Sequence, residues 1–586
     1  MLEKALLLTG HRPSGDDHRA ERLLEFFGVP YQTQYAGELQ LTQSHQGESN
    51  TRYRLLCAAE TFDRVIGVLP DLLGGPDEFA QRVHSVFLYS NGDAPVLANV
   101  VSQLSGAKIS ICPGAGSETP CCIADDPDGL CGAMRGLRIH PSVAALTSCD
   151  FFDLNGSSVT AVIAAGNKAA FLKLVWMGVP VFVSSARLID IDANLATRNF
   201  DIRDHLLSAV PVVSYLRWAF ASSSWNTPEA SACLVIDDPL LRARYGFVRF
   251  RQLLALMKQI RFSTSIAFIP WNWRRSNPKV VQLFRDNPEI YSLCVHGCDH
   301  TAGEFATSDR LRLRAVASEA LRRMSLHERR TGLAHDRLMV FPQGVFSEEA
   351  ILELKRAGFY AVVNTEVHSV PARKRELTIS DVWDVAVMAY GDFPIYTRRY
   401  PAQGIENFAF DLLLGKPCLA VIHHDFCGDG YAGLVQFIEQ LNALRVPLTW
   451  RRAGDVIRRS YRQKESLSDS VEVEMYGSEL LIENRSQRAK SYLIRRREHD
   501  SNSIESLHAG SRRVSWDSAG DYIEFRLTVG PGESTLLTLR FKAAEDLAHR
   551  RQNLAHSIKT LLRRYLSEAR DNYVLPTKSR LASFVK

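Results

Sequence analysis

The sequence predicts a multidomain α/β protein in which two α/β regions precede an all-β region and a terminal helix. Three observations support this prediction. Short apolar runs alternate with amphipathic helical patterns over residues 1–220 and again over 231–462. The pattern then changes to alternating polar and apolar residues over 468–542. The chain of 586 residues is also too long for a single hydrophobic core.

The first region, residues 1–220, has the strand–helix alternation of an open doubly wound sheet of the Rossmann or flavodoxin type. Its strands are expected at 5–9, 65–69, 85–89, 158–164 and 179–183. Residues 10–15 join a predicted strand to a predicted helix, but they lack the Lys-Ser/Thr ending and the glycine spacing of phosphate-binding loops. Because the region has no nucleophile elbow and no CxxC pair, we expect it to be non-catalytic.

The second region, residues 231–462, contains seven repeats of an apolar run followed by a helical pattern, which predicts a distorted (β/α)7 barrel. Its strands are expected at 233–236, 264–269, 291–295, 338–341, 360–364, 385–389 and 418–422. Residues 221–230, which precede it, are rich in Ser, Asn, Thr and Pro. This composition is typical of a domain boundary that few contacts cross, so we expect a modest polar interface between the two α/β regions.

The third region, residues 468–542, alternates polar and apolar residues between turn signals, which predicts a small antiparallel β-sandwich. The remaining residues, 543–586, contain a basic amphipathic helix whose apolar stripe includes Leu554, Ile558 and Leu561. Such a helix can lie on a membrane surface. More often it docks on its own protein, which is the arrangement that we expect here.

Composition and charge argue against several classes of protein. The chain has 70 basic and 65 acidic residues, and this slight excess indicates no nucleic-acid partner. No apolar stretch is long enough to span a membrane, and the first residues lack the features of a secretion signal. The 11 cysteines show no disulfide framework, so we expect reduced thiols and a cytoplasmic location. The oligomeric state is left open.

Acidic and histidine residues follow three of the predicted barrel strands. They are Asp237 and Asp238 after the first strand, His296 and His300 after the third, and His423 and His424 after the seventh. Because the carboxyl ends of parallel strands converge on one face, we expect these side chains to meet. Asp238 with the His-x-x-x-His pair can form a three-ligand metal site that leaves a position for water. Asp237 would then be free to act as a base.

The order of these motifs resembles the polysaccharide deacetylases of carbohydrate esterase family 4, the NodB-homology group. The resemblance covers roughly residues 231–452 and rests on Asp237-Asp238, His296-x-x-x-His300, Phe341-Pro342-Gln343-Gly344 and Ile422-His423-His424. It implies a distorted seven-stranded barrel and a divalent metal, most simply Zn²⁺, with Co²⁺ or Ni²⁺ as alternatives. The implied reaction is removal of acetyl groups from an N-acetylated amino sugar polymer or its precursor.

The resemblance also implies a role for each motif residue. Asp238, His296 and His300 would bind the metal, while Asp237 would be the general base and His424 the general acid. The family's arginine, which orients the base, would fall at Val340, so Arg398 or Arg399 after the sixth strand is a candidate replacement. Further candidates for substrate binding are Trp271, Trp273, Pro342, Gly344, His423 and Arg398.

Two other classes of function stay open on the sequence. A glycoside hydrolase would need two carboxylates at a set separation, for which Asp237 and Asp392 are candidates. A barrel that only binds carbohydrate is the other alternative. Paired acidic residues at one strand end are common as turn or cap residues. Acidic and histidine motifs at three strand ends of one barrel are much rarer, which favours metal-dependent catalysis.

Overall fold

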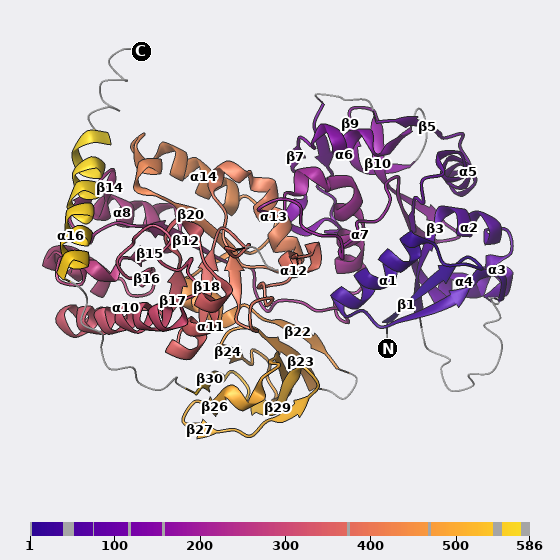
Figure 1. Ribbon diagram of the computed structural model, residues 1–586. Helices are drawn as coiled ribbons and strands as arrows, with labels where there is room; N and C mark the ends of the chain where they lie inside the picture. The colour runs from indigo at the N-terminus through magenta and orange to yellow at the C-terminus, as the bar shows by residue number, and fades with distance from the viewer. Residues whose placement is uncertain are drawn as a thin grey trace, which may run out of the picture.

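The computed structural model contains two α/β parts, a β-rich region and a C-terminal helix (Figure 1). The described residues are 3–38, 52–73, 75–114, 119–154, 159–371, 376–466, 470–542 and 554–575. Figure 1 shows the helix α16 (Leu554–Ala569) beside the barrel, on the side away from the N-terminal part. Within these stretches no helix combines the length and the apolar character needed to cross a bilayer.

The N-terminal part is built on one mixed sheet, half of which has the expected doubly wound pattern. Its parallel half consists of β1 (Glu3–Thr9), β2 (Tyr31–Tyr35), β3 (Arg52–Ala58), β4 (Val83–Tyr89) and β11 (Val179–Ser184). Its antiparallel half continues through β10 (Lys168–Trp176), β9 (Thr160–Ala165), β6 (Cys121–Ile123) and β7 (Arg138–Ile139). Helices α1 (Gly15–Phe27) and α5 (Ala94–Ser105) bury their apolar faces in two different core clusters, so both faces of the sheet are covered.

One expected strand of the N-terminal part is wrong. Residues 65–69 lie where α2 (Ala59–Val65) ends and α3 (Leu69–Leu72) begins. The strand lies earlier, in β3. In α2, Phe62 and Val65 are buried three residues apart on one helical face. A short apolar run of this kind cannot be told from a strand by periodicity alone.

The barrel is a nearly closed ring of seven parallel strands surrounded by helices (Figure 1). In spatial order its strands are β19 (Ile395–Thr397), β18 (Ala361–Asn364), β17 (Leu338–Val340), β16 (Tyr291–His296), β15 (Thr264–Phe268), β12 (Ser231–Asp237) and β20 (Cys418–Ile422). The ring closes through a parallel bridge between Arg399, after β19, and Ala420 of β20. The outer helices include α8 (Phe250–Ile260), α10 (Arg310–Thr331), α11 (Glu348–Ala357), α13 (Ile405–Leu414) and α14 (Ala432–Asn442).

Alternation along the strands decides which side chains face the barrel interior. On β12, Cys233 and Val235 belong to a core cluster that also contains single residues from the other strands, such as Cys294 of β16 and Leu419 of β20. The intervening residues of the same strands belong to the cluster that faces the outer helices. Since successive side chains of a strand point to opposite faces, Asp237, two residues after Val235, faces inward at the barrel mouth.

The sixth barrel strand lies further along the chain than the sequence indicates. Residues 385–389 are buried but make only one antiparallel bridge, from Val387 to Ile395 of β19. Gly391 and Asp392 both have positive φ, and there the chain turns back before β19. The apolar run therefore packs on the strand that follows it, and the barrel strand itself is only three residues long.

Two sheets of the C-terminal region share one apolar core. The first contains β22 (Arg462–Glu465), β23 (Ser470–Met475), β25 (Lys490–Arg497), β29 (Tyr522–Val529) and β28 (Asp517–Ala519). The second contains β24 (Glu479–Glu483), β30 (Ser534–Phe541), β26 (Ile504–Ala509) and β27 (Arg512–Arg513). Buried residues of both sheets form a single cluster. The expected purely antiparallel pairing is wrong in one place, because β24 crosses to the other sheet and leaves β23 and β25 parallel.

The two α/β parts share a continuous hydrophobic core. Phe200 of the N-terminal part stacks on Phe410 of α13, with ring centroids 5.7 Å apart. The backbone of Leu195 donates a hydrogen bond of 2.7 Å to Leu377 on the barrel side. The expectation of a modest polar interface beside residues 221–230 is therefore wrong, because large aromatic side chains are buried between the two parts.

Candidate metal and catalytic site

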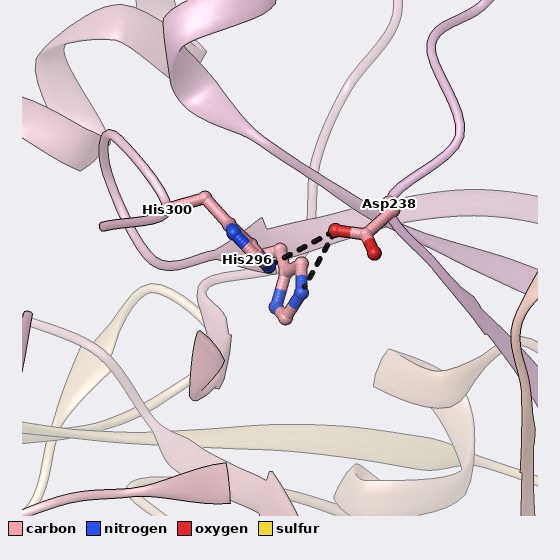
Figure 2. Close-up of side chains that lie close together, drawn as sticks. All are labelled: Asp238, His296 and His300. Atoms are coloured by element: carbon pink, nitrogen blue, oxygen red, sulfur yellow. Dashed lines mark ion pairs between the residues drawn. The ribbon is translucent and has the colours of Figure 1, made fainter. Parts of the chain in front are cut away.

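Three side chains from the ends of two barrel strands converge at the barrel mouth. Asp238 follows β12, and its Oδ1 lies 3.4 Å from His296 Nε2 and 3.0 Å from His300 Nε2 (Figure 2). Although both imidazole nitrogens are close to it, this buried oxygen accepts no well-aligned hydrogen bond in the described structure. Three donor atoms that converge in this way suit a shared cation. Two imidazoles and one carboxylate are also the donor set of open zinc sites, and Co²⁺ and Ni²⁺ accept the same ligands.

The backbone and the charge of this group fit the same interpretation. Asp238 (φ 80°) and His300 (φ 55°) both adopt the left-handed region, which residues other than glycine rarely occupy outside functional sites. Burial disfavours the charge on Asp238, but the two imidazoles outweigh it and hold the pKa of Asp238 well below its usual value. Burial lowers the pKa of His300, which favours the neutral imidazole that a metal requires.

His296 is oriented by a backbone group on the neighbouring strand. Its Nδ1 lies 3.0 Å from the carbonyl oxygen of Val340 in β17. A carbonyl oxygen only accepts hydrogen bonds, so Nδ1 carries a proton, and Nε2 faces Asp238. Metal-binding histidines are commonly fixed by such a second hydrogen bond.

A second group of possible ligands supports the loop that carries His300. Cys298, Asp299 and Glu304 also lie close together and are all buried. The Glu304 carboxylate, however, accepts backbone hydrogen bonds from Cys298, Asp299 and His300 at 3.0, 2.8 and 3.3 Å. Asp299 is paired with Arg323 of α10. These oxygens already have partners, so the group holds the loop in shape and is not a second metal site.

The carboxylate of Asp237 is held by a single arginine. Arg398, directly after β19, donates two hydrogen bonds to it, at 2.7 and 2.6 Å, and both residues are almost fully buried. Burial would raise the pKa of Asp237, but Arg398, together with His296, outweighs this effect and lowers it. Arg399, the other candidate of the sequence, points elsewhere and pairs with Asp411. The structure therefore places Arg398, rather than Arg399, where it can orient the carboxylate of Asp237.

The two histidines after β20 lie in different surroundings. His423 lines the cavity and stacks on Tyr400, with ring centroids 6.0 Å apart. His424 packs edge-on against Tyr245, and its Nε2 lies 3.5 Å from Asp571 Oδ1. His424, the predicted general acid, therefore does not line this cavity, whereas the neighbouring His423 does, and which of the two acts as the acid stays a prediction. Alternation explains the difference, because Leu419 faces the barrel interior and His423 has the same parity on the strand.

These side chains surround one cavity of about 390 Å³ at the barrel mouth. Its lining includes Asp237, Asp238, His296, His300, Gly344, Arg398 and His423. Phe341 and Gln343 of the quoted motif also line it, and so do Thr365, Glu366 and Tyr400, which the sequence did not indicate. A volume of this size is usual for a site that binds a small molecule or one unit of a polymer.

Three of the predicted substrate contacts do not line this cavity. Trp271 lies against Arg323, with the guanidinium 5.1 Å from the ring centroid, and Trp273 lies against Arg274 at 4.5 Å. Pro342 is fully buried against Gly297. These residues pack on the protein itself, so the expectation of sugar stacking on the two tryptophans is not met at this cavity.

Asp392, the second carboxylate that the glycoside hydrolase alternative named, does not line the described cavity. Asp392 is buried and accepts a backbone hydrogen bond from His499 at 3.0 Å. Its other oxygen lies 3.3 Å from Arg497 of β25. Asp392 thus ties the barrel to the β-rich region and does not face Asp237.

The C-terminal helix docks on its own protein, as expected from the sequence, but the sequence did not indicate its contribution to the cavity. Side chains of α16 and of the π-helical turn η9 (Arg570–Val574) complete the cavity wall, namely Arg563, Arg564, Ser567, Arg570 and Asp571. Two contacts hold this helix in place. Glu568 is paired with both terminal nitrogens of Arg275, and Tyr245 donates a hydrogen bond of 2.9 Å to Asp571. The arginines were visible in the sequence, but nothing in it showed that they line this cavity.

No protein-family model matches the chain, and no curated protein matches it. Among solved structures, it is similar to the crystal structure of Agd3, described as a novel carbohydrate deacetylase, with 9% identity and a TM-score of 0.50. That likeness covers 92% of this chain and 98% of the other.

Two further similar structures cover less of the chain. The family 4 carbohydrate esterase from Streptomyces lividans has 13% identity and a TM-score of 0.24, over 38% of this chain and 92% of that one. Peptidoglycan deacetylase PdaC from Bacillus subtilis has 10% identity and a TM-score of 0.25, over 40% and 92%. Both TM-scores lie below 0.5, so only the Agd3 likeness bears on the fold. Nearly the whole chain thus has the fold of a carbohydrate deacetylase, which confirms the resemblance seen in its motifs at the level of fold.

Proposed function

We propose that the protein is a metal-dependent N-deacetylase that removes acetyl groups from an N-acetylated amino sugar polymer or its precursor. The observation that carries the proposal is the arrangement at the barrel mouth. The carboxylate of Asp237, which is paired with the buried Arg398, lines the same cavity as Asp238, His296 and His300. The fold shared with a carbohydrate deacetylase supports the reaction class.

In the proposed reaction, water attacks the acetyl carbon and the C–N bond breaks, giving acetate and a free amine. Asp238, His296 and His300 would hold a divalent ion, which when bound would supply Lewis acidity to the reaction. Asp237 accepts the proton of the attacking water. Its lowered pKa keeps it ionised, and therefore able to accept that proton, at neutral pH.

The protonation of the leaving amine is assigned to His423 in place of His424. His423 lines the same cavity as Asp237 and the group Asp238, His296 and His300, which supports a position near the reacting atoms. Stacking on Tyr400 restricts the orientation of its ring. A cationic imidazole that gives its proton to the amine nitrogen completes the proton balance, since Asp237 has taken one from water.

The test is acetate release from a panel of N-acetylated amino sugars and oligosaccharides, by full-length protein loaded with Zn²⁺, Co²⁺ or Ni²⁺. Asp237→Asn is expected to retain the metal and to lose activity by about 10²–10⁴-fold, because an amide cannot take the proton. Asp238→Asn is expected to lose metal as well. Acetate release by Asp237→Asn at the wild-type rate would refute this mechanism, and absence of release from every member by metal-loaded wild type would refute the function.

A further inference from the structure

On the basis of the proposed deacetylase function, we propose that Arg564 and Arg563 of α16 form an anion subsite in the catalytic cavity. We infer that the amino sugar carries a phosphate or a carboxylate, on the reacting unit or on the one next to it. The inference concerns a wall of the cavity that lies outside the barrel motifs, and it rests on the burial and the pairing of the charges there.

Arg564 is the central observation. Its side chain is only 4% exposed and it lines the cavity, yet its Nε is buried without a hydrogen-bond partner. Among the residues that the structure describes, no ion pair joins it to a carboxylate. Burying a guanidinium is costly unless an anion compensates for its lost hydration. An anionic ligand in the cavity would therefore supply the partner that Arg564 lacks.

The charges of the cavity leave these arginines in excess. The charged side chains that line it are Asp237, Asp238, Glu366 and Asp571, with Arg398, Arg563, Arg564 and Arg570. Asp237 is paired with Arg398. Asp571 accepts a hydrogen bond of 2.7 Å from Arg570. Asp238 faces the two histidines of the metal group. In this count of charges, one carboxylate, that of Glu366, remains to balance the two guanidiniums of α16. A bound divalent ion would add to the positive charge.

The chemistry of the guanidinium selects the ligand class. Its planar fork matches the paired oxygens of a phosphate or a carboxylate, and such charge-assisted hydrogen bonds are about twice as strong as neutral ones. Since Arg564 and the metal group line the same cavity of about 390 Å³, one small substrate can reach both. This places the anionic group within one sugar unit of the acetamide.

The subsite is held in position before any substrate arrives. Glu568, one turn after Arg564 on the helix, is paired with Arg275, next to the loop that follows β15. Asp571 accepts a hydrogen bond from Tyr245, and Asn572 accepts one from the backbone of Gly246 at 2.8 Å. These contacts fix the part of the helix that directly follows the subsite, so Arg564 does not have to be ordered when the substrate binds.

The test compares acetate release from three matched compounds, which are the methyl glycoside of N-acetylglucosamine, N-acetylglucosamine 1-phosphate and an N-acetylated hexosaminuronic acid. Wild type is expected to prefer at least one charged compound over the neutral one by about tenfold or more in kcat/KM. Arg564→Gln should remove this preference, mainly through KM, and leave the neutral compound within about twofold of wild type. Arg564→Lys should restore part of it, because the charge remains without the fork. The phosphate and uronate arms distinguish the two anionic groups.

Lys559→Gln is the matched control, because Lys559 is an exposed cation on the same helix that does not line the cavity. It should leave the preference unchanged. Equal kcat/KM for all three compounds in wild type, or an equal loss for all three in Arg564→Gln, would overturn the inference.

Calorimetric titration of the full chain with inorganic phosphate, before and after a chelator, separates the subsite from the proposed function. Phosphate binding that survives the chelator and is lost in Arg564→Gln is expected, even if no compound releases acetate. If wild type shows neither this binding nor the substrate preference, the subsite does not exist, whatever the reaction catalysed.

Discussion

Arg398 donates hydrogen bonds of 2.7 and 2.6 Å to the two carboxylate oxygens of Asp237, in a pair almost completely excluded from solvent. Arg398 directly follows β19, and Asp237 is the last residue of β12. These two strands are not neighbours in the sheet, so the pair crosses the barrel mouth. Val340, where the family resemblance would place an arginine, is fully buried among apolar residues. The chain thus supplies a guanidinium to the carboxylate from a different strand.

Removal of this guanidinium is expected to shift the pH dependence of activity. The base works only when ionised, so activity falls as the pH decreases through the pKa of Asp237. Arg398 lowers that pKa, and without it burial dominates and raises the pKa. In Arg398→Gln the acid limb of kcat/KM should move to higher pH, with a larger loss at acidic than at alkaline pH.

Arg399→Gln is the control for this experiment, since it removes a neighbouring buried arginine that is paired with Asp411 and does not line the cavity. The acid limb of the kcat/KM profile of Arg399→Gln should lie at the same pH as in wild type. A uniform loss of activity in Arg398→Gln with no movement of the limb would show that Arg398 acts on something other than the ionisation of Asp237.

The metal ligands are expected to be separable from the rest of the fold. His296→Ala and His300→Ala each leave two protein donors, too few to retain a divalent ion firmly, so bound metal should fall from about one per chain to a small fraction. Glu304→Gln, which weakens the loop that carries His300, should lower metal affinity by about 10–100-fold. Elemental analysis after reconstitution measures these changes.

His335→Ala serves as the histidine control for metal binding. This ring pairs with Glu328 at 3.1 Å and lies outside the cavity lining, so its loss should not change the metal content. Full metal retention in both His296→Ala and His300→Ala would contradict the proposed ligand set.

Substitutions of the two neighbouring histidines after β20, His423 and His424, should have different effects. His423→Ala is expected to lower kcat by about 10²–10⁴-fold, the usual effect of losing a general acid. The loss should shrink for an aryl acetate ester, whose leaving group departs without protonation. His424→Ala removes a buried contact to Asp571, so its main effect should be a lower melting temperature, with only a minor effect on kcat. The reverse pattern would restore the assignment made from the sequence.

The strand ends of the barrel were predictable because their signals are local. The runs that became β12 and β16 are short, apolar and followed directly by Asp237-Asp238 and His296, so strand parity and motif order point to one face. The His-x-x-x-His spacing is local too, and it placed His300 correctly beside His296. Convergence of parallel strand ends then brought these side chains together.

The remaining features depend on contacts between distant parts of the chain. The choice between His423 and His424 required the exact register of β20, which a one-residue shift reverses. The helix α16 begins at Leu554, 92 residues after the end of the barrel region at residue 462, and its amphipathic pattern favours docking on the protein without indicating where it docks. The aromatic interface around Phe200 could not be predicted for the same reason. The composition of a linker does not indicate which side chains its flanking domains bury against each other.

That interface leads to the last prediction, which concerns the dependence of the barrel on the N-terminal part. Removal of residues 1–221 would expose Phe410 and the other residues of α13 that pack against Phe200 in the shared core. Each large apolar side chain returned to water costs about 1.5–3 kcal/mol, against a total stability of about 5–15 kcal/mol for a typical domain. The truncated chain should therefore aggregate or melt well below the full chain.

A point variant tests the interface without the truncation. Phe200→Ala in the full chain should lower the free energy of unfolding by about 3–5 kcal/mol, as is usual for a buried aromatic ring. An exposed replacement on the same part, Val143→Ala, should change it by less than about 0.5 kcal/mol, because Val143 is 68% exposed. Chemical denaturation measures both variants. If the truncated chain is monomeric, melts at the wild-type temperature and holds its metal, the two parts are independent. The packing of Phe200 on Phe410 would then be a contact without energetic weight.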